Sequence, residues 1–125
     1  MKVRKGIDGK LDTAWALLVK LKAGMKCEYC GKTTYLNSHH IFSRSKRSTR
    51  WNVNNGVCLC VGHHTFSSTF SAHKTPLEFV DWLTNKKGEE FIDRLRIQAH
   101  SLSKLHNFEK QILLDELNKE IKNYE

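Results

Sequence analysis

The sequence predicts a single small α+β domain, in which a metal-stabilised hairpin unit is flanked by helices. The chain has 125 residues, the length of one domain. Apolar residues recur at helical spacing towards both ends. Residues 25–73 lack this periodicity and are rich in Ser, Thr, Asn, Gly, Cys and His. We therefore expect an N-terminal helix in residues 1–24, a zinc-stabilised core in 25–74 and C-terminal helices in 75–125.

The first helix is expected over residues 11–21, where Trp15 and Val19 share an apolar face. Gly24 is a plausible stop signal for it. Residues 1–10 contain two glycines and several charges, and we expect them to be irregular. The core that follows should contain a hairpin and end in a short helix from about Cys60.

Two helices are expected after the core. The segment Thr75-Pro76-Leu77-Glu78 predicts a helix start, with Thr75 and Glu78 forming a capping box and Pro76 in the first turn. Gly88 should interrupt this helix, and the next should run from Glu89 to about Ala99. The apolar residues expected to face inward are Phe79, Trp82 and Leu83 in the first helix and Phe91, Ile92 and Leu95 in the second.

A further apolar stripe predicts an amphipathic C-terminal helix. Its members are Leu105, Phe108, Ile112, Leu113, Leu117 and Ile121. Packing on the core of the same chain is the simpler interpretation of this stripe. The alternative is that the C-terminal helices pair with a second subunit and form a homodimer.

The charge balance points to a polyanionic partner. Lys and Arg total 21 against 13 Asp and Glu, which gives a formal net charge of +8. Nucleic acid is the expected partner of such a small basic chain, and an anionic membrane surface is the weaker alternative. No apolar run approaches the roughly 20 residues needed to cross a bilayer. No apolar signal core follows the basic start of the chain, so we expect a cytoplasmic location.

Four cysteines lie in the core, at positions 27, 30, 58 and 60. A Cys-x-x-Cys pair with histidines nearby indicates metal ligation rather than disulfides in a cytoplasmic protein. Cys27 and Cys30 form one such pair, and Cys60 and His63 form a second at matching spacing. Together they would make a closed tetrahedral site for a structural Zn²⁺.

Cys58 offers an alternative zinc ligand. On a strand, Cys58 and Cys60 would point to the same face, so either could reach the metal. A four-thiolate site with Cys58 would release His63, but the Cys-x-Cys spacing is less common. We favour Cys60 with His63, and expect Cys58 to be a small buried apolar residue.

Histidines between and beside these pairs suggest a second metal site. Adjacent pairs occur at His39-His40 and His63-His64. Hydrolysis of a phosphodiester needs a base to activate water and a cation to stabilise the developing charge. Histidine can serve as the base or as a neutral metal ligand near neutral pH. A hairpin with two adjacent histidines can therefore supply one residue for each task.

The order of these residues resembles the HNH (ββα-metal, His-Me finger) endonuclease family. The matching elements are Cys27-x-x-Cys30, His39-His40-Ile41 and Asn55 nine residues before His64, beside the second Cys/His pair. The chain is closest to phage HNH proteins and to the NinG/Rap-like recombination endonucleases of lambdoid phages. Those have comparable Thr-Arg-Trp and Ala-His-x-x-Pro-x-x-Phe-x-x-Trp segments, which begin here at Thr49 and Ala72. The resemblance covers residues 27–99 and excludes the first and last helices.

The resemblance implies hydrolysis of DNA phosphodiester bonds with 5′-phosphate and 3′-hydroxyl ends. His39 would be a ligand of a catalytic divalent cation, and His40 would be the general base. Asn55 would hold the loop and orient the base. His64 would be the second cation ligand, and His73 either a third ligand or a phosphate contact.

Two features of the implied site stay open. The family more often has a cysteine at the position of His63, so the roles of His63 and His64 are exchangeable in principle. Mg²⁺ or Mn²⁺ would be the natural catalytic cation, although histidine ligands also suit Ni²⁺, Co²⁺ or Zn²⁺.

A basic segment between His40 and Asn55 is the expected DNA contact. Residues 43–51 contain four cations, four hydroxyls and one tryptophan. Such side chains bind phosphates without reading base sequence. The cations are Arg44, Lys46, Arg47 and Arg50. We expect Trp51 to anchor the loop in the core rather than to stack on a base.

The sequence thus predicts a metal-dependent DNA endonuclease, encoded by a phage and acting in the host cytoplasm in DNA recombination, processing or packaging. One alternative is a noncatalytic zinc module that binds DNA or RNA. Another is a phage protein that acts mainly through protein contacts of its C-terminal helices.

Overall fold

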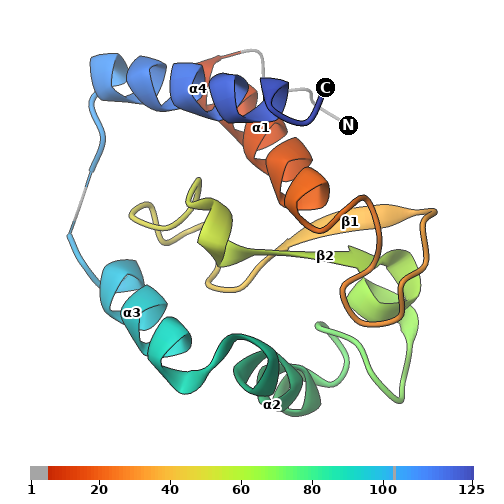
Figure 1. The fold of residues 1–125 in the computed structure, drawn as a ribbon. Helices are drawn as coiled ribbons and strands as arrows, with labels where there is room; N and C mark the ends of the chain where they lie inside the picture. The colour runs from red at the N-terminus through yellow and green to blue at the C-terminus, as the bar shows by residue number, and fades with distance from the viewer. Residues whose placement is uncertain (1–5, 103) are drawn as a thin grey trace.

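A computed structural model describes residues 6–102 and 104–125. The chain forms a two-stranded antiparallel sheet and a set of helices, as the predicted α+β class requires (Figure 1). The elements are α1 (Ile7–Lys22), β1 (Leu36–His40), η1 (Val53–Asn55), β2 (Gly56–Cys60), η2 (Gly62–Phe66), α2 (Pro76–Lys87), α3 (Glu89–Ala99) and α4 (Asn107–Lys122). No helix in the described ranges is both long enough and apolar enough to cross a membrane.

The two strands pair in a register that fixes the positions of the histidines. Leu36 lies opposite Cys60, and His40 lies opposite Gly56. The pairing continues past the strand end, where the Ile41 N–H donates to the carbonyl oxygen of Asn55 at 2.9 Å. The connection between the strands is therefore the long basic loop, and both of its ends are fastened to the sheet.

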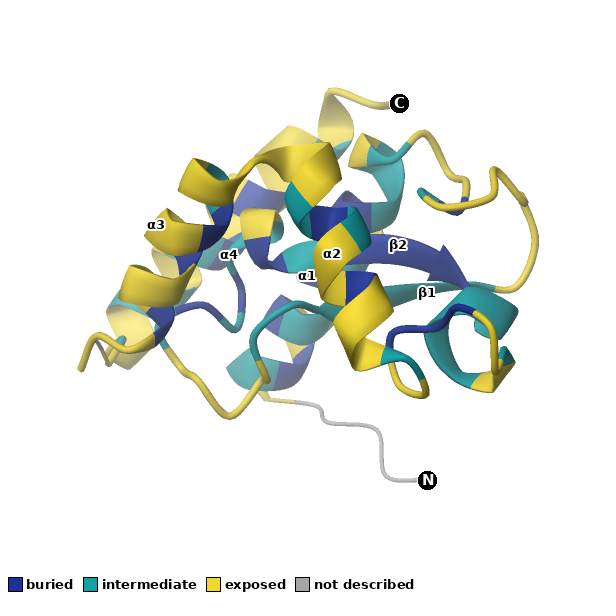
Figure 2. Ribbon diagram, turned by 90° about the horizontal axis from the view of Figure 1, so that it is seen from below, coloured by how far each residue is buried: buried dark blue, intermediate teal, exposed yellow. Residues whose placement is uncertain are grey.

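Helices cover both faces of the hairpin (Figure 1). On one face, the Ser38 hydroxyl donates to the carbonyl oxygen of Ala16 in α1 at 2.6 Å. A Cβ on Gly56 would meet the side chains of Val19 and Trp15, the latter at 2.9 Å, so only glycine allows α1 to lie this close. Leu59 packs on the other side in a cluster with residues of α2 and α3. Figure 2 shows β2 as a buried strand between these helices.

The first helix begins earlier than expected. α1 includes residues 7–10, which were expected to be irregular; residues 1–5 lie outside the described part of the chain. Asp8 in the first turn suits the helix start, because a carboxylate there is stabilised by the free backbone N–H groups. Asp8 also pairs with Lys110 of α4 at 2.8 Å, a tertiary contact that sequence periodicity does not reveal.

The C-terminal helix packs against α1 with most of the expected apolar stripe, but two members of that stripe face outward. Leu114 and Leu117 are its buried residues. Phe108 and Ile112 belonged to the expected inward stripe, yet they are 67% and 55% exposed. The other members of the expected stripe, Leu105, Leu113, Leu117 and Ile121, do belong to or pack against the core cluster, and Leu114 joins them as a buried residue outside that stripe.

The helices after the core have the expected bounds, but their expected cap is absent. α2 begins with Pro76 and is separated from α3 by Gly88, whose φ of +94° favours glycine. The Thr75 side chain makes no cap hydrogen bond. Its hydroxyl instead donates to the carbonyl oxygen of Ser71 and accepts from the Ser71 N–H. The capping-box prediction was therefore wrong, because the preceding turn engages Thr75.

The short helix expected from about Cys60 is a single wide turn. It is η2, closed by a bond from the Ser67 N–H to the carbonyl oxygen of Gly62 at 2.8 Å. The Ser67 hydroxyl then accepts from the N–H groups of Thr69 and Phe70. This local turn explains why the helix ends there and does not extend towards α2.

Candidate metal centres and nucleic-acid interface

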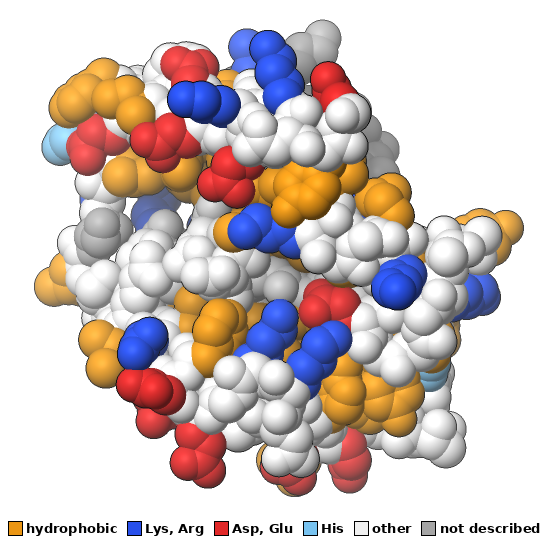
Figure 3. Space-filling view, in the orientation of Figure 1, with side chains coloured by type: hydrophobic (Ala, Val, Ile, Leu, Met, Phe, Trp, Pro, Cys, Tyr) orange, Lys and Arg blue, Asp and Glu red, His pale blue; other side chains and the backbone are white. Residues whose placement is uncertain are grey.

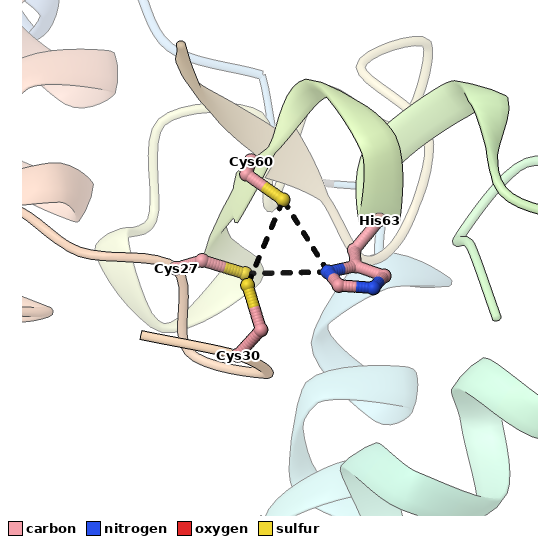
Figure 4. Close-up of side chains that lie close together, drawn as sticks. All are labelled: Cys27, Cys30, Cys60 and His63. Atoms are coloured by element: carbon pink, nitrogen blue, oxygen red, sulfur yellow. Dashed lines mark hydrogen bonds between the residues drawn. The ribbon is translucent and has the colours of Figure 1, made fainter. Parts of the chain in front are cut away.

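Three cysteines and one histidine meet beside the end of β2 (Figure 4). Cys27 and Cys30 lie in a turn before the sheet, where Gly31, with a φ of +80°, accepts a conformation unsuited to other residues. Cys60 ends β2, and His63 follows in η2. The ligand atoms of this group all lie within 4.8 Å of one another.

The spacing of these atoms suits tetrahedral zinc. With zinc bonds of about 2.3 Å to sulfur and about 2.0 Å to nitrogen, two sulfurs would lie about 3.8 Å apart and a sulfur and a nitrogen about 3.6 Å apart. The Sγ atoms of Cys30 and Cys60 are 3.8 Å apart. The Nδ1 atom of His63 lies 3.3 Å from Cys60 Sγ and 4.0 Å from Cys27 Sγ. The residues therefore fit a structural metal such as zinc.

The protein environment already favours a thiolate at Cys27. Burial would raise the pKa of this thiol, but backbone N–H groups of Cys60, Cys30 and Tyr29 and the ring of His63 lower the pKa to about 6. A thiolate is the form of cysteine that binds metal. Cys27 is thus prepared for ligation near neutral pH.

Cys58 is separate from this group. It is fully buried in the cluster with α1, where burial and then the charges of Glu28 and Cys27 raise the pKa of its thiol to about 11. The structure places Cys60 and His63, and not Cys58, with the first cysteine pair. All four cysteines lie in the described part of the chain, and none is disulfide-bonded.

Glu28 ties the cysteine turn to the rest of the fold, a role that sequence reasoning missed. Its carboxylate accepts from the Cys58 N–H at 2.8 Å, and its own N–H donates to the Cys58 carbonyl oxygen. The same carboxylate pairs with Lys86 and Lys87 at the end of α2. The sequence did not predict these contacts, because the two residues between the cysteines of a Cys-x-x-Cys turn are usually exposed to solvent.

A second cluster joins three of the predicted histidines. His39 on β1, His64 in η2 and His73 in the following turn have ligand nitrogens within 4.8 Å of one another. The backbone fastens two of them together, because the His73 N–H donates to the carbonyl oxygen of His64 at 3.1 Å. The ring of His39 meets Phe79 of α2 edge-on, with centroids 5.2 Å apart.

The three-histidine cluster also has the chemistry of a metal site. The Nε2 atoms of His64 and His73 are 3.1 Å apart, between the separations of about 3.0 Å and about 3.3 Å that octahedral and tetrahedral ions impose on neighbouring nitrogens. The Nδ1 atom of His64 is buried and has no hydrogen-bond partner among the described residues. A buried polar atom without a partner is rare in folded proteins. This one belongs to a residue of the three-histidine cluster.

Lowered pKa values keep the rings of His39 and His64 neutral near pH 7. Burial lowers the pKa of His39 to about 3, and the neighbouring rings of His64, His73 and His40 add to the shift. Burial and then His73 lower the pKa of His64. Neutral imidazole is the form that binds a metal ion.

His40 lies on the opposite side of the hairpin from His39. Its ring stacks on Trp15 of α1, with centroids 3.8 Å apart and planes 8° apart. Its Nε2 atom lies 2.9 Å from the carbonyl oxygen of Arg50. A carbonyl oxygen only accepts, so Nε2 must carry the proton and Nδ1 must carry the free electron pair. Burial lowers the pKa of His40, against the opposing effect of the Arg50 carbonyl.

Asn55 holds the two ends of the basic loop. The residue is fully buried. Its Oδ1 accepts from the Phe42 N–H at 2.8 Å, and its Nδ2 donates to the carbonyl oxygens of Phe42 and Thr49 at 3.0 and 3.1 Å. Its side chain therefore fixes the loop on both sides of the basic residues, as the sequence interpretation required of it.

The four cations of the loop differ in their surroundings. Lys46 and Arg47 are exposed, and Arg44 is exposed beside Asp12 at 3.4 Å. Arg50 is different: both Nε and Nη2 donate to the Asp12 carboxylate, at 3.1 and 2.8 Å, and its side chain is 11% exposed. Arg50 is thus engaged within the fold, while the other three remain accessible for phosphate.

Trp51 anchors the loop in the core, as expected. It is buried beside α1, and its Nε1 donates to Asp12 at 2.8 Å. Asp12 and Trp15 of α1 both contact this segment. The sequence indicated Trp15 only as an apolar residue of the first helix, and the contacts of both residues with the loop were missed. The available signal was their spacing of three residues, which places both on one side of a helix.

Acidic side chains lie around α4, in contrast to the basic loop. On the face shown in Figure 3, acidic side chains gather over α4 and the surface is hollowed below it. A cavity of about 580 Å³ lies there, lined in part by Glu109, Glu116 and Glu120. Arg47 of the basic loop also lines this cavity, so the basic and acidic side chains meet at its rim.

Comparison with protein-family models, with curated proteins and with solved structures found no match. The function is therefore inferred from the residues of this chain and their geometry.

Proposed function

We propose that this chain is a metal-dependent endonuclease of the HNH (ββα-metal) type that hydrolyses DNA phosphodiester bonds. One observation carries the proposal: the consecutive residues His39 and His40 serve two different sites. His39 joins a three-imidazole cluster that could hold a cation. His40 has its Nε2 proton directed to a carbonyl oxygen, which leaves Nδ1 able to accept a proton.

The proposed reaction assigns each group a task. Nδ1 of His40 takes a proton from water, the resulting hydroxide attacks the phosphorus, and the bond from phosphorus to the 3′ oxygen breaks. A divalent cation held by His39, His64 and His73 would neutralise the charge that develops on the phosphate and the leaving oxygen. The products would be a 5′-phosphate and a 3′-hydroxyl. Mg²⁺ or Mn²⁺ is the proposed cation, with Ni²⁺, Co²⁺ and Zn²⁺ also suited to imidazole ligands.

The remaining parts of the site support this chemistry. Asn55 fixes the loop that follows His40. Arg44, Lys46 and Arg47 are exposed on that loop and would bind DNA phosphates on either side of the cleaved bond. Zinc in the Cys₃His site would be structural, because four protein ligands leave no position for water or substrate.

The biological setting is part of the proposal. The segments beginning at Thr49 and Ala72 resemble those of phage HNH proteins, which favours a phage-encoded enzyme of recombination, processing or packaging in the host cytoplasm. A homodimer through the C-terminal helices is proposed on the exposure of Phe108 and Ile112.

A noncatalytic zinc module that binds DNA or RNA is the second candidate. The Cys₃His group and the exposed basic loop would serve it equally well. A module of this kind would not need the ligand nitrogens of three histidines to lie within 4.8 Å of one another. The number of bound metal ions therefore separates the two functions.

The test combines metal binding with cleavage. Zinc-loaded protein should hold one tight zinc and bind Mn²⁺ at a weaker second site, and it should cut a labelled duplex into fragments that DNA ligase can seal. His64→Ala should lose the second site and the cleavage but keep the zinc, whereas His106→Ala, at an exposed helix cap, should keep all three. One zinc, no second site and no cleavage by the wild type would support the binding module instead.

A further inference from the structure

Two residues of α1, one helical turn apart, hold the segment that orients His40. Asp12 accepts two hydrogen bonds from the Arg50 guanidinium and one from Trp51 Nε1. Trp15 Nε1 donates to the carbonyl oxygen of Asn52 at 2.8 Å. Three consecutive loop residues, 50–52, are therefore fastened to one face of one helix.

The same segment carries the hydrogen-bond acceptor of His40. Nε2 of His40 donates to the carbonyl oxygen of Arg50, the residue whose side chain Asp12 binds. The His40 ring is also covered by Trp15, whose plane is 8° from parallel. The Arg50 carbonyl oxygen thus fixes the edge of the imidazole, and Trp15 fixes its face. Both contacts depend on α1, because Arg50 is held by Asp12 and Trp15 is itself a residue of that helix.

We propose that Asp12 and Trp15 are positioning residues that hold His40 in the tautomer and orientation needed by a general base. This inference rests on the proposed function for its effect on cleavage. Asp12 acts through Arg50: its carboxylate fixes the guanidinium and thereby the backbone carbonyl that receives the His40 proton. Trp15 acts by stacking on the ring and by holding Asn52. The proposed active site therefore includes α1, which lies outside the region of family resemblance.

The surroundings of Asp12 favour its charged form. Although burial alone would raise the pKa of Asp12, hydrogen bonds from Arg50 and Trp51 and the charges of Arg50 and Arg44 lower it. The carboxylate is therefore ionised at neutral pH. A bidentate Arg–carboxylate pair also fixes geometry better than a single contact, because both groups are planar.

The experiment compares Asp12→Asn with Asp8→Asn. Asp8 lies on the same helix and is also ion-paired, with Lys110, but it touches no part of the loop segment. Asparagine at position 12 keeps the size of the side chain and loses the charge and one acceptor. We expect Asp12→Asn to lower kcat about tenfold to a hundredfold, with zinc content unchanged, and Asp8→Asn to leave kcat unchanged.

Two readouts separate positioning from a general loss of structure. Nitrogen NMR of the zinc-loaded protein should show His40 protonated at Nε2 in the wild type and a mixture of tautomers in Asp12→Asn. In a His40→Ala background, Asp12→Asn should cause no further loss of the residual rate, because the two changes act through one group. If Asp12→Asn does not fold, Trp15→Phe is the second variant: it keeps an aromatic ring at this position, removes the hydrogen bond to Asn52 and leaves a small cavity in the core. It should lower kcat in the same way.

The outcomes are distinct. A wild-type protein that cuts no DNA would overturn the proposed function, while the tautomer measurement would still test the positioning. An Asp12→Asn variant that retains the Nε2 tautomer and the wild-type kcat would overturn the positioning. Additive losses in the double variant would also overturn it.

Discussion

His39 and His40 are consecutive residues whose rings lie on opposite sides of the hairpin. His39 meets Phe79 of α2 edge-on, and His40 stacks on Trp15 of α1. Successive side chains of a strand alternate between faces, so a step of one residue places one imidazole on each side of the hairpin. The hairpin thereby separates the ring that joins the His64 and His73 cluster from the ring that is hydrogen-bonded to the Arg50 carbonyl oxygen.

The zinc site makes the first prediction. We expect Cys27→Ala to leave the purified protein without zinc and largely unfolded, because binding of a structural metal contributes directly to folding. Cys58→Ala should keep one zinc and lose only about 1 kcal/mol of unfolding free energy, from a small cavity in the core. Metal analysis and thermal unfolding of both variants provide the check. Loss of zinc in Cys58→Ala would contradict the ligand assignment.

The histidine cluster makes a prediction about acid. Burial lowers the pKa of His39 to about 3, whereas an unfolded histidine has a pKa of about 6.5. Between these values the unfolded chain binds a proton that the folded chain does not, so stability falls as the pH drops through this window. When the pH is lowered from about 7 to about 5, the unfolding free energy of both proteins should fall. The fall should be smaller in His39→Gln than in the wild type, by up to about 2 kcal/mol.

Urea unfolding at the two pH values measures this difference. His100→Gln is the control, because His100 is exposed at the end of α3. Because acid affects the zinc site of His100→Gln and of the wild type alike, the unfolding free energy of His100→Gln should change with pH as that of the wild type does. Equal losses in His39→Gln and wild type would contradict a buried neutral imidazole.

Asn55 makes a prediction about the loop. Asn55→Ala removes three hydrogen bonds and leaves the Phe42 and Thr49 backbone without partners, so we expect a loss of roughly 2–4 kcal/mol of unfolding free energy. Trypsin should then cut more rapidly after Lys46 or Arg47. Asn54→Ala is the matched control, since the neighbouring side chain is exposed. Unchanged protease resistance in Asn55→Ala would show that the loop does not depend on this amide.

The basic loop makes a prediction about salt. Lys46→Ala and Arg47→Ala should each weaken DNA binding alike for all sequences and reduce the slope of log affinity against log salt by about 1. Arg50→Ala should leave that slope unchanged and lower thermal stability, because Arg50 is paired with Asp12. Fluorescence anisotropy across a salt series measures both effects. A slope change for Arg50→Ala as large as that for Lys46→Ala would place Arg50 on DNA.

Local patterns in the sequence predicted much of the site. The two Cys/His pairs have a spacing that suits one metal, and the structure brings the expected Cys27, Cys30, Cys60 and His63 together. The Pro76 and Gly88 signals also gave the bounds of α2, because proline and glycine act on the backbone at their own positions.

Features that depend on tertiary packing were not predictable in this way. The capping box failed because Ser71, four residues earlier, engages Thr75. Phe108 and Ile112 were wrongly expected to face inward in α4, because apolar periodicity does not reveal which neighbour a helix meets. The contacts of Asp12 with Arg50 cross 38 positions of sequence, and no local pattern marks such a pair.

The central claim is that His40 is the base of a metal-dependent nuclease. The most direct measurement is cleavage of supercoiled plasmid with Mg²⁺ or Mn²⁺ by wild type, His40→Ala and His100→Ala, with EDTA as the metal-free control. We expect wild type and His100→Ala to nick or linearise the plasmid only with metal, and folded, zinc-loaded His40→Ala to be slower by about a hundredfold or more. Cleavage by His40→Ala at the wild-type rate, or a wild type that binds DNA and cuts with neither ion, would contradict the claim.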